Sequence, residues 1–273
     1  MARQTHTAPA ATTRATGMVL PGPHDTVRVV PLFVPDEVKA PTLEAQAAAT
    51  PPHLTYEGGQ LLTSVEVFTV FWGSAWTAAQ SQLATQINAF FDNILTSPLM
   101  DQLGEYSTGS YHIGHGKRIG TATITKPALH HTVSDHAIQH MLNQEIATNS
   151  QFPQPGPNVL YFVYLQPGVA VVQGGSRSCQ AFCGYHDAIN NTIFYAVMPF
   201  ANCGGCLGSM STLDALTSTS SHELCEAITD AIPGQGWYDQ NNGEIGDICA
   251  WQTKKIGNYT VQQEWSNNAG ACV

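Results

Sequence analysis

The sequence predicts an α/β fold, with a mixed sheet and a metal-binding helix towards the end of the chain. Three observations lead to this prediction: apolar segments of strand length, helical periodicities between them, and a His and a Glu four residues apart at His222 and Glu226. The 273 residues are 43% hydrophobic, which is enough to bury a sizeable core. We expect a single folded domain at residues 53–273, preceded by an N-terminal arm at 1–52.

The arm is rich in Ala, Thr and Pro and has few aromatic residues. Such a segment cannot bury enough apolar surface to offset the entropy lost on ordering, so we expect it to be flexible. Within it, the mostly apolar residues 27–34 can pair as an edge strand. Arg3 and Arg14 are followed by no apolar run of signal-peptide length, so no signal peptide is visible in this chain.

The predicted domain begins with a strand and a helix. Residues 65–72 are apolar on nearly both faces, which is typical of a strand that is covered on both sides. Ser74 is expected to cap a helix whose apolar residues recur at helical spacing until Pro98 ends it. A short strand at 119–124 follows, and this alternation indicates an α/β layer.

Two more strands and two more helices complete the predicted core. Ser134 is expected to cap a helix that carries His136 and His140, a pair that we interpret as structural because no third ligand lies nearby in sequence. Strongly apolar strands are expected at 159–165 and 192–198. A last helix carries the metal-binding motif. The predicted order is therefore β-α-β-α-β-β-α.

The last helix contains the pattern H-E-x-x-E. Positions four apart lie on the same face of a helix, so His222 and Glu226 can reach one point in front of it, with Glu223 beside them. The zinc-hydrolase signature H-E-x-x-H has two ligands flanking a general-base Glu, and here a carboxylate replaces the second imidazole. The same residues also suit the solvated face of an amphipathic helix. Together with the order of elements, the motif predicts a zincin-like domain.

A zinc hydrolase needs a third protein ligand and one position for water. Glu244 lies 22 positions after His222, close to the spacing of the third ligand in thermolysin-like peptidases. By that analogy Glu244 is the ligand and Asp247 accepts from the distal nitrogen of His222, although the reverse assignment is almost as acceptable. Calcium is the alternative ion, because Asp230, Asp239, Glu244 and Asp247 together offer many oxygen ligands.

The predicted ligand set determines how strongly bound water is acidified. One His with two carboxylates cancels the charge of a zinc ion, so we expect a weaker hydrolase than a two-His site would give, or a different metal. Glu223 is the expected general base, and a peptide or protein is the expected substrate. His186 and Tyr238 are candidates for stabilising the oxyanion, although each can equally be a packed or hydrogen-bonded core residue.

The chain has seven cysteines, and an odd count in an oxidising compartment leaves one free. Cys225, on the ligand helix, is the expected free thiol. For the other six we expect bridges between cysteines close in sequence: Cys179 with Cys183, Cys203 with Cys206, and Cys249 with Cys272. The spacing of the first four also suits a structural zinc. The low proportion of charged residues, 11%, favours disulfides.

Charge and hydropathy restrict the partners. The net charge of −10 and the scattered basic residues argue against nucleic acid or an anionic membrane as partner. No window of eighteen apolar residues exists, so no membrane-spanning helix is expected. The low charged content is typical of exported proteins. We therefore expect an extracellular protein that acts as a monomer.

Several separated blocks of the sequence resemble the EXORDIUM or phosphate-induced protein family of plant extracellular proteins, and still more its bacterial and fungal relatives. The blocks are Y-E-G-G at 56–59, F-W-G at 71–73, S-D at 134–135, C-G-Y-H at 183–186, S-H-E-L-C-E at 221–226, W-Y at 237–238 and E-I-G-D-I-C at 244–249. The helix of the plant members likewise reads H-E-x-x-E. The resemblance implies an extracellular setting with disulfides. It also implies an alternative to the hydrolase: a non-catalytic protein that binds cell-wall polysaccharide or another wall component and keeps its metal for structure.

Overall fold

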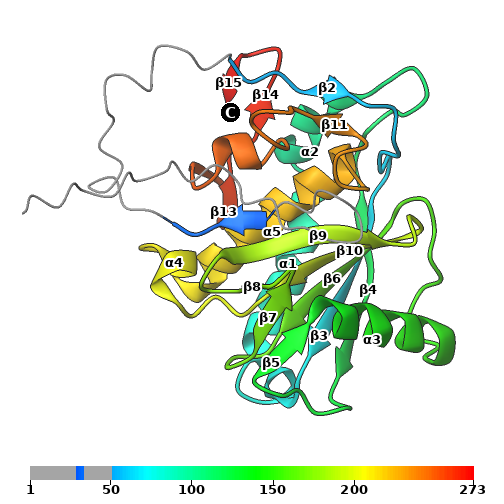
Figure 1. Cartoon of the computed structure of the whole chain (residues 1–273), viewed down its shortest axis with the longest axis vertical. Coiled ribbons are helices and arrows are strands. Elements are labelled where there is room, and N and C mark those ends of the chain that lie inside the picture. Colours follow the sequence, from blue (N-terminus) through cyan, green and yellow to red (C-terminus); the bar gives the residue numbers. More distant parts are fainter. Residues whose placement is uncertain (1–28, 34–50) are drawn as a thin grey trace, which may run out of the picture.

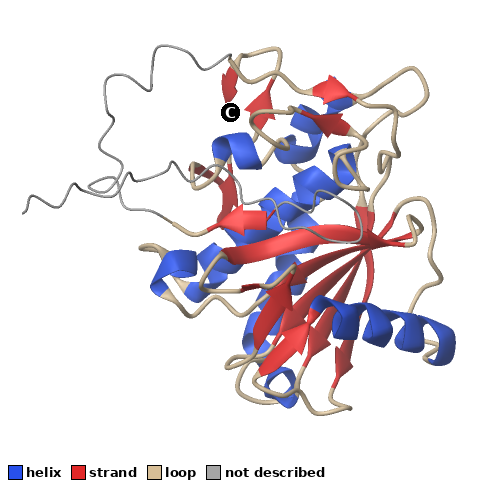
Figure 2. Ribbon diagram, in the orientation of Figure 1, coloured by secondary structure: helices blue, strands red, loops and turns tan. Residues whose placement is uncertain are grey.

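A six-stranded mixed sheet lies at the centre of the protein, with helices on both of its faces (Figures 1 and 2). The computed structural model describes residues 29–33 and 51–273. In sheet order, the strands are β1 (Val29–Pro31), β9 (Phe182–Ile189), β10 (Ile193–Met198), β6 (Val159–Leu165), β3 (Glu66–Trp72) and β4 (Lys117–Ile124). The last four run parallel, whereas β9 is antiparallel to β10 and β1 is antiparallel to β9. The predicted α/β fold with a mixed sheet is confirmed.

Alternate side chains of the central strands belong to two separate cores. In β6, Phe162 and Tyr164 point to one face of the sheet, and Tyr161 and Val163 point to the other. Both sets are buried, which explains why these strands read as continuous apolar runs. The four strands predicted at 65–72, 119–124, 159–165 and 192–198 are confirmed to within two residues.

Helices α1 (Ser81–Ile94), α2 (Pro98–Leu103) and α5 (Thr212–Thr229) pack against one face, and α3 (Asp135–Thr148) packs against the other. The hydroxyl of Ser134 accepts a hydrogen bond from the Ala137 amide at 3.2 Å, so the predicted cap of α3 is confirmed. Within the described residues, no helix is both long and apolar enough to cross a bilayer.

The first helix differs from the prediction at both ends. Ser74 begins a short 3-10 turn, η2 (Ser74–Thr77), and α1 begins only at Ser81. Pro98 does not end that helix: α1 ends at Ile94, and Pro98 is the first residue of α2. Pro98 can begin a helix because proline has no N–H, and an N–H at the first helical position would have no partner within the helix. The Ser97 hydroxyl caps this helix by accepting from the Leu99 amide at 3.2 Å.

Smaller elements surround the sheet. They are β2 (Thr55–Tyr56) with β11 (Trp237–Tyr238); β5 (Thr132–Ser134), β7 (Ala170–Gln173) and β8 (Ser176–Arg177); β12 (Thr253–Ile256) with β13 (Tyr259–Gln262); β14 (Trp265–Ser266) with β15 (Ala271–Cys272); helix α4 (Gly204–Leu207); and the 3-10 turns η3 (Gly104–Tyr106) and η4 (Asp247–Cys249). Although the C-terminal tail lacks periodicity in sequence, it forms two hairpins, and β13 packs directly on α5.

Most of the arm predicted at 1–52 lies outside the described residues. The part that is described includes β1, which pairs along the free side of β9 and agrees with the edge strand expected within 27–34. The indole of Trp251 donates to the carbonyl of Pro31 at 2.8 Å, and its ring lies 5.4 Å from that of Phe33. β1 also contacts α5 and η4, so this segment lies against the elements that carry the H-E-x-x-E motif and Asp247.

Three disulfides connect the chain, and two of them differ from the predicted pairs. The bridge between Cys249 and Cys272 is confirmed, as is a free, buried thiol at Cys225. The other bridges join Cys179 to Cys203 and Cys183 to Cys206. The predicted bridges between Cys179 and Cys183 and between Cys203 and Cys206 are therefore wrong. Because α4 packs on the beginning of β9, both cysteines of the α4 segment face β9 and the turn before it. Three of these four thiols, Cys179, Cys203 and Cys206, also lie close enough together to hold one ion, so a structural zinc at the reduced thiols stays a prediction.

Candidate metal centre

The residues of the H-E-x-x-E motif lie inside the protein, on a helix that is buried along most of its length. Helix α5 is capped at Ser211, whose hydroxyl accepts from the Asp214 amide at 3.1 Å. The side chains of His222, Glu223 and Glu226 are 0% exposed. The reading of these residues as a solvated helix face is therefore wrong, because β9, β13 and the loop after α5 enclose that face.

One nitrogen of His222 is held in place and the other faces a carboxylate. Nδ1 lies 3.0 Å from Oε1 of Gln262, a pure acceptor, so Nδ1 carries the proton and donates it. The amide nitrogen of Gln262 in turn donates to the carbonyl of Gly246 at 2.8 Å, which fixes the orientation of the amide. Nε2 is 2.9 Å from Oε1 of Glu226, but it makes no hydrogen bond within the described part of the chain. Two atoms so placed can bind one cation.

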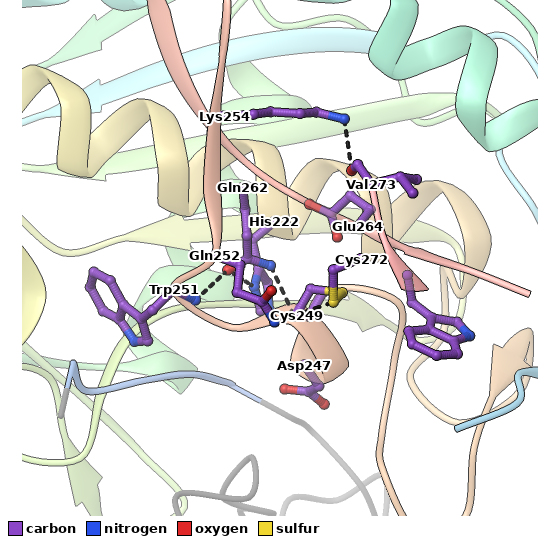
Figure 3. Close-up of a disulfide and its surroundings, with 12 residues drawn as sticks. His222, Asp247, Cys249, Trp251, Gln252, Lys254, Gln262, Glu264, Cys272 and Val273 are labelled. Atoms are coloured by element: carbon purple, nitrogen blue, oxygen red, sulfur yellow. Dashed lines mark hydrogen bonds between the residues drawn. A yellow bond between two sulfur atoms is a disulfide. The ribbon is translucent and has the colours of Figure 1, made fainter. Parts of the chain in front are cut away.

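Asp247 completes a three-residue group with His222 and Glu226. One ligand atom from each of the three lies within 4.8 Å of the others. The backbone amide of Asp247 donates to Oε1 of Glu226 at 3.1 Å, and its carboxylate accepts from the Glu244 amide at 3.2 Å. Figure 3 shows His222 beside Gln262, with Asp247 below the ring. Of the two assignments left open by the sequence, this arrangement favours Asp247 as the ligand, and Gln262 takes the role of partner to the distal nitrogen.

His186 enters the same region from strand β9. It is 1% exposed, and its Nδ1 lies 3.2 Å from Oε2 of Glu223 and 3.6 Å from Oε2 of Glu226. Its other nitrogen, Nε2, lies 3.0 Å from the carbonyl oxygen of Asp230 and 3.5 Å from Oε1 of Glu244. The structure therefore brings Glu223, Glu226, Glu244 and His186 into one buried cluster, and a second three-residue group, His186 with Glu223 and Glu226, meets the same 4.8 Å limit.

Tyr238 is the remaining residue predicted for the site. It is buried on β11, where it pairs with Thr55 of β2. Its proposed role in stabilising an oxyanion stays a prediction. His136 and His140 are exposed on α3 and belong to no metal-ligand group among the described residues; their structural interpretation stays a prediction.

Two glycines allow the backbone to approach these side chains closely. A Cβ on Gly246 would lie 2.8 Å from Cγ and Nδ1 of His222 and 2.9 Å from Oε1 of Glu226. A Cβ on Gly184 would lie 2.7 Å from the methyl group of Thr219 and 3.2 Å from Oε1 of Glu223. Any larger residue would therefore separate the loop or β9 from α5.

Burial and mutual repulsion strongly perturb the carboxylates. Burial, and then the charge of Glu226, hold the pKa of Glu244 well above its usual value. Burial acts in the same direction on Glu226, but the imidazoles of His222 and His186 outweigh it and lower the pKa of Glu226 to about 2. Glu226, between the two rings, therefore stays charged.

Each imidazole is in turn held in its charged form. Burial opposes a charge on both rings, yet the carboxylates outweigh it: Glu244 and Glu223 raise the pKa of His186 well above its usual value, and Glu226 and Glu223 do the same for His222. Positive charge is thus favoured at two separate points, one at each ring.

The four acids of the calcium alternative do not all point to one place. The carboxylate of Asp230 accepts from the backbone amides of Gly234, Gln235 and Gly236, and so closes the turn after α5. The carboxylate of Asp239 is likewise held by backbone amides, among them that of His53 at 2.7 Å. Calcium at the acidic cluster stays a prediction.

Comparison with known proteins adds no identification. No family model matches the chain, and no curated protein matches it significantly. Membership of the EXORDIUM or phosphate-induced family therefore stays a prediction. The function has to be inferred from the buried centre itself.

Proposed function

We propose that the protein is a metal-dependent hydrolase whose catalytic cation is bound by Nε2 of His222, a carboxylate oxygen of Glu226 and the carboxylate of Asp247. The observation that carries this proposal is the orientation of His222. Its Nδ1 donates to Gln262, so Nε2 points at a carboxylate 2.9 Å away and is the nitrogen at which a cation can replace a proton. An imidazole nitrogen and a carboxylate oxygen so placed can both be ligands of one ion.

Zinc is the ion that the donor set suits best. One imidazole and two carboxylates are common ligands of Zn²⁺, and three protein ligands leave one position for water. Ca²⁺ and Mg²⁺ prefer oxygen ligands alone. The mixed sheet backed by a helix with H-E-x-x-E also supports the zincin-like assignment of the domain.

The proposed reaction is hydrolysis of a peptide bond in a peptide or protein. A bound cation would supply an acidified water as the nucleophile, and a nearby carboxylate would take the proton of that water and pass it to the departing amine. Glu223 is placed for this role, because it follows His222 on α5 and is not part of the group around that ring. Burial first, and then Glu226, raise the pKa of Glu223, which brings it closer to the range of an effective base.

The second candidate function is a non-catalytic extracellular protein that binds cell-wall polysaccharide and keeps a structural metal. The burial of the centre favours this reading, because Asp247, at 9%, is the most exposed of the three ligands. Catalysis needs a path for substrate, which a structural metal does not. The three disulfides suit an oxidising, extracellular environment under either proposal.

Metal binding is the first test. Purified full-length protein, stripped with a chelator and then dialysed against zinc, is expected to retain the ion, and His222→Ala is expected to lose the position at His222. His140→Ala removes an exposed imidazole on α3 and serves as the matched control. Zinc content that is the same in all three proteins would remove the site at His222.

Cleavage of denatured casein and of a peptide library separates the two functions. The hydrolase predicts cleavage that stops with a chelator, returns with zinc, and falls at least 100-fold in Glu223→Gln, as expected for loss of a general base. Metal binding without any chelator-sensitive cleavage would instead support the polysaccharide-binding protein. Retention of the protein on insoluble cell-wall polysaccharide would then be measured.

A further inference from the structure

We propose a second cation position beside the first, formed by Nδ1 of His186, Oε2 of Glu223 and Oε2 of Glu226. Glu226 then bridges two metal ions, with Oε1 facing the ion at His222 and Oε2 facing the ion at His186. This inference rests on the proposed function only for the ion at His222. It deepens that proposal from a one-metal to a two-metal hydrolase.

The first step is the protonation of His186. Its Nε2 lies 3.0 Å from the carbonyl oxygen of Asp230, which can only accept, so Nε2 carries a proton. Its Nδ1 is therefore the nitrogen that would give up a proton to bind a cation, and its neighbours are oxygens of Glu223 and Glu226. An imidazole with one nitrogen donating to a carbonyl and the other facing carboxylates has the orientation of a metal ligand. His222 is oriented in the same way through Gln262.

The second step is the spacing of the atoms. Ligands around a tetrahedral zinc lie about 3.3 Å apart, given metal–ligand bonds of about 2.0–2.1 Å. Nδ1 of His186 is 3.2 Å from Oε2 of Glu223 and 3.6 Å from Oε2 of Glu226. The second of these distances is too long for a hydrogen bond but suits two ligands of one ion.

The third step is the pair of oxygens that the protein leaves unsatisfied. Oε2 of Glu226 and Oε1 of Glu223 are buried and make no hydrogen bond with any described residue. A buried carboxylate oxygen without a partner is costly, and a charged one more so. A cation in front of the two side chains satisfies Glu226 directly and compensates the charge of Glu223.

The fourth step is the charge of the whole cluster. Six buried carboxyl groups surround the two rings: Glu223, Glu226, Asp230, Glu244, Asp247 and Glu264. If all six are ionised beside two neutral imidazoles, a single divalent ion leaves four negative charges uncompensated and a second ion leaves two; without the ions, protons take their place. Two nearby divalent ions are a known arrangement for hydrolysis, because both acidify a bridging water and clamp the reacting oxygens.

A second ion changes the role of Glu223. With the ion in place Glu223 is a ligand, so its removal lowers metal content as well as activity. A water shared by two ions is also acidified more strongly than by one zinc whose charge two carboxylates cancel. The weak activation expected for a single ion at His222, Glu226 and Asp247 is thereby overcome.

The test is the number of metal ions per chain. Zinc is added to chelator-stripped full-length protein, excess ion is dialysed away, and content is measured by elemental analysis. We expect two ions in the wild type and in the exposed-surface control His140→Ala, and one ion in His186→Ala and in Glu223→Gln. One ion in the wild type, unchanged in His186→Ala, would overturn the second position and leave the proposed function intact. No bound ion in the wild type would overturn both.

Cobalt titration of the wild type decides the matter if His186→Ala does not fold. Co²⁺ absorbs visible light with an intensity that reports its coordination, so the spectrum should rise until two equivalents are bound. Magnetic coupling between the two ions should reduce the paramagnetic resonance signal per cobalt as the second equivalent binds. Saturation at one equivalent, with an uncoupled signal, would overturn the proposal.

Discussion

At the scale of single residues, Gly246 shows how closely the loop after α5 approaches the imidazole of His222. Gly246→Ala would place a methyl group 2.8 Å from the His222 ring and 2.9 Å from Glu226, so the ring or the loop must shift. We expect a 10- to 100-fold loss of zinc affinity, which is roughly the effect of disturbing the partners of a metal-binding His. Competition with a chromophoric chelator measures it.

Gly109→Ala is the control for that substitution. A Cβ at Gly109 meets no atom within 4 Å, so this change adds the same methyl group without a contact. If Gly246→Ala binds zinc as tightly as Gly109→Ala and wild type, the His222 ring is not a ligand in the orientation described.

The same residues show what could be predicted locally. His222, Glu223 and Glu226 were found from sequence because helix geometry alone places residues four apart on one face. Gln262 was missed, since it comes from a hairpin 40 positions further along, and only the packing of β13 on α5 brings its amide to the ring. Glu264, also buried there, gives no local signal either.

At the scale of elements, β9 is the strand of the central sheet that the sequence did not predict. Its residues Phe182–Ile189 include Gly184, His186 and Asp187 and form no apolar run, yet the whole strand is buried. The polar side chains are tolerated because each has partners: His186 meets Glu223 and the Asp230 carbonyl, and Asp187 accepts from the Ala188 amide at 2.7 Å. A strand that carries a binding site does not show the apolar pattern by which strands are recognised.

Strand β1 leads to a prediction about access to the centre. Val30 pairs with Gly184 on β9, two residues before His186, and is buried. Val30→Asp should weaken the docking of β1 by about 2 kcal/mol, the value of burying one Val side chain. Local opening would then be roughly 30-fold more frequent. We expect release of zinc to a chelator to accelerate by at least tenfold.

The opposite edge of the same sheet supplies the control for Val30→Asp. Thr123 is an exposed, β-branched residue of β4, so Thr123→Asp places the same charge on an edge strand far along the sheet order from β9. Stopped-flow release from this variant should match wild type. Equal release rates in all three proteins would show that β1 does not cover the path of the ion.

At the scale of the whole molecule, the order of elements was predictable and the closure of the centre was not. The β-α-β-α-β-β-α order follows from apolar runs and caps, which are local, and it is found in β3, α1, β4, α3, β6, β10 and α5, with β9 inserted before β10 and smaller elements added. The centre instead forms where α5, β9, the loop around Glu244 and β13 meet. Which carboxylates converge depends on how these four segments pack, and no spacing in the sequence encodes that.

The metal-free protein should lose stability as pH rises, because the centre binds protons more tightly when folded. Burial raises the pKa of Asp230 to about 6, although the amides of Gly236 and Gly234 oppose it, and burial with Glu226 holds the pKa of Glu244 well above its usual value. The pKa values of His186 and His222 are also raised. The stability that these protons contribute is complete below the unfolded-state pKa values and is lost as pH rises through the folded ones: between 3.8 and about 6 for Asp230, and at higher pH for Glu244 and the two imidazoles.

Metal ions replace those protons, so the stabilisation by zinc should grow over the same pH range. At free zinc about 1,000-fold above the dissociation constant, each site contributes ~4 kcal/mol, which raises the melting temperature by roughly 10 °C. Thermal unfolding at about pH 5.5 and pH 8, with chelator and with zinc, measures both effects. The difference in melting temperature between the zinc and chelator samples should be larger at the higher pH. In His222→Ala this difference should be smaller than in the wild type. A difference that does not change with pH would mean that the buried carboxyl groups keep their protons when zinc is present, and that the ion binds elsewhere on the protein.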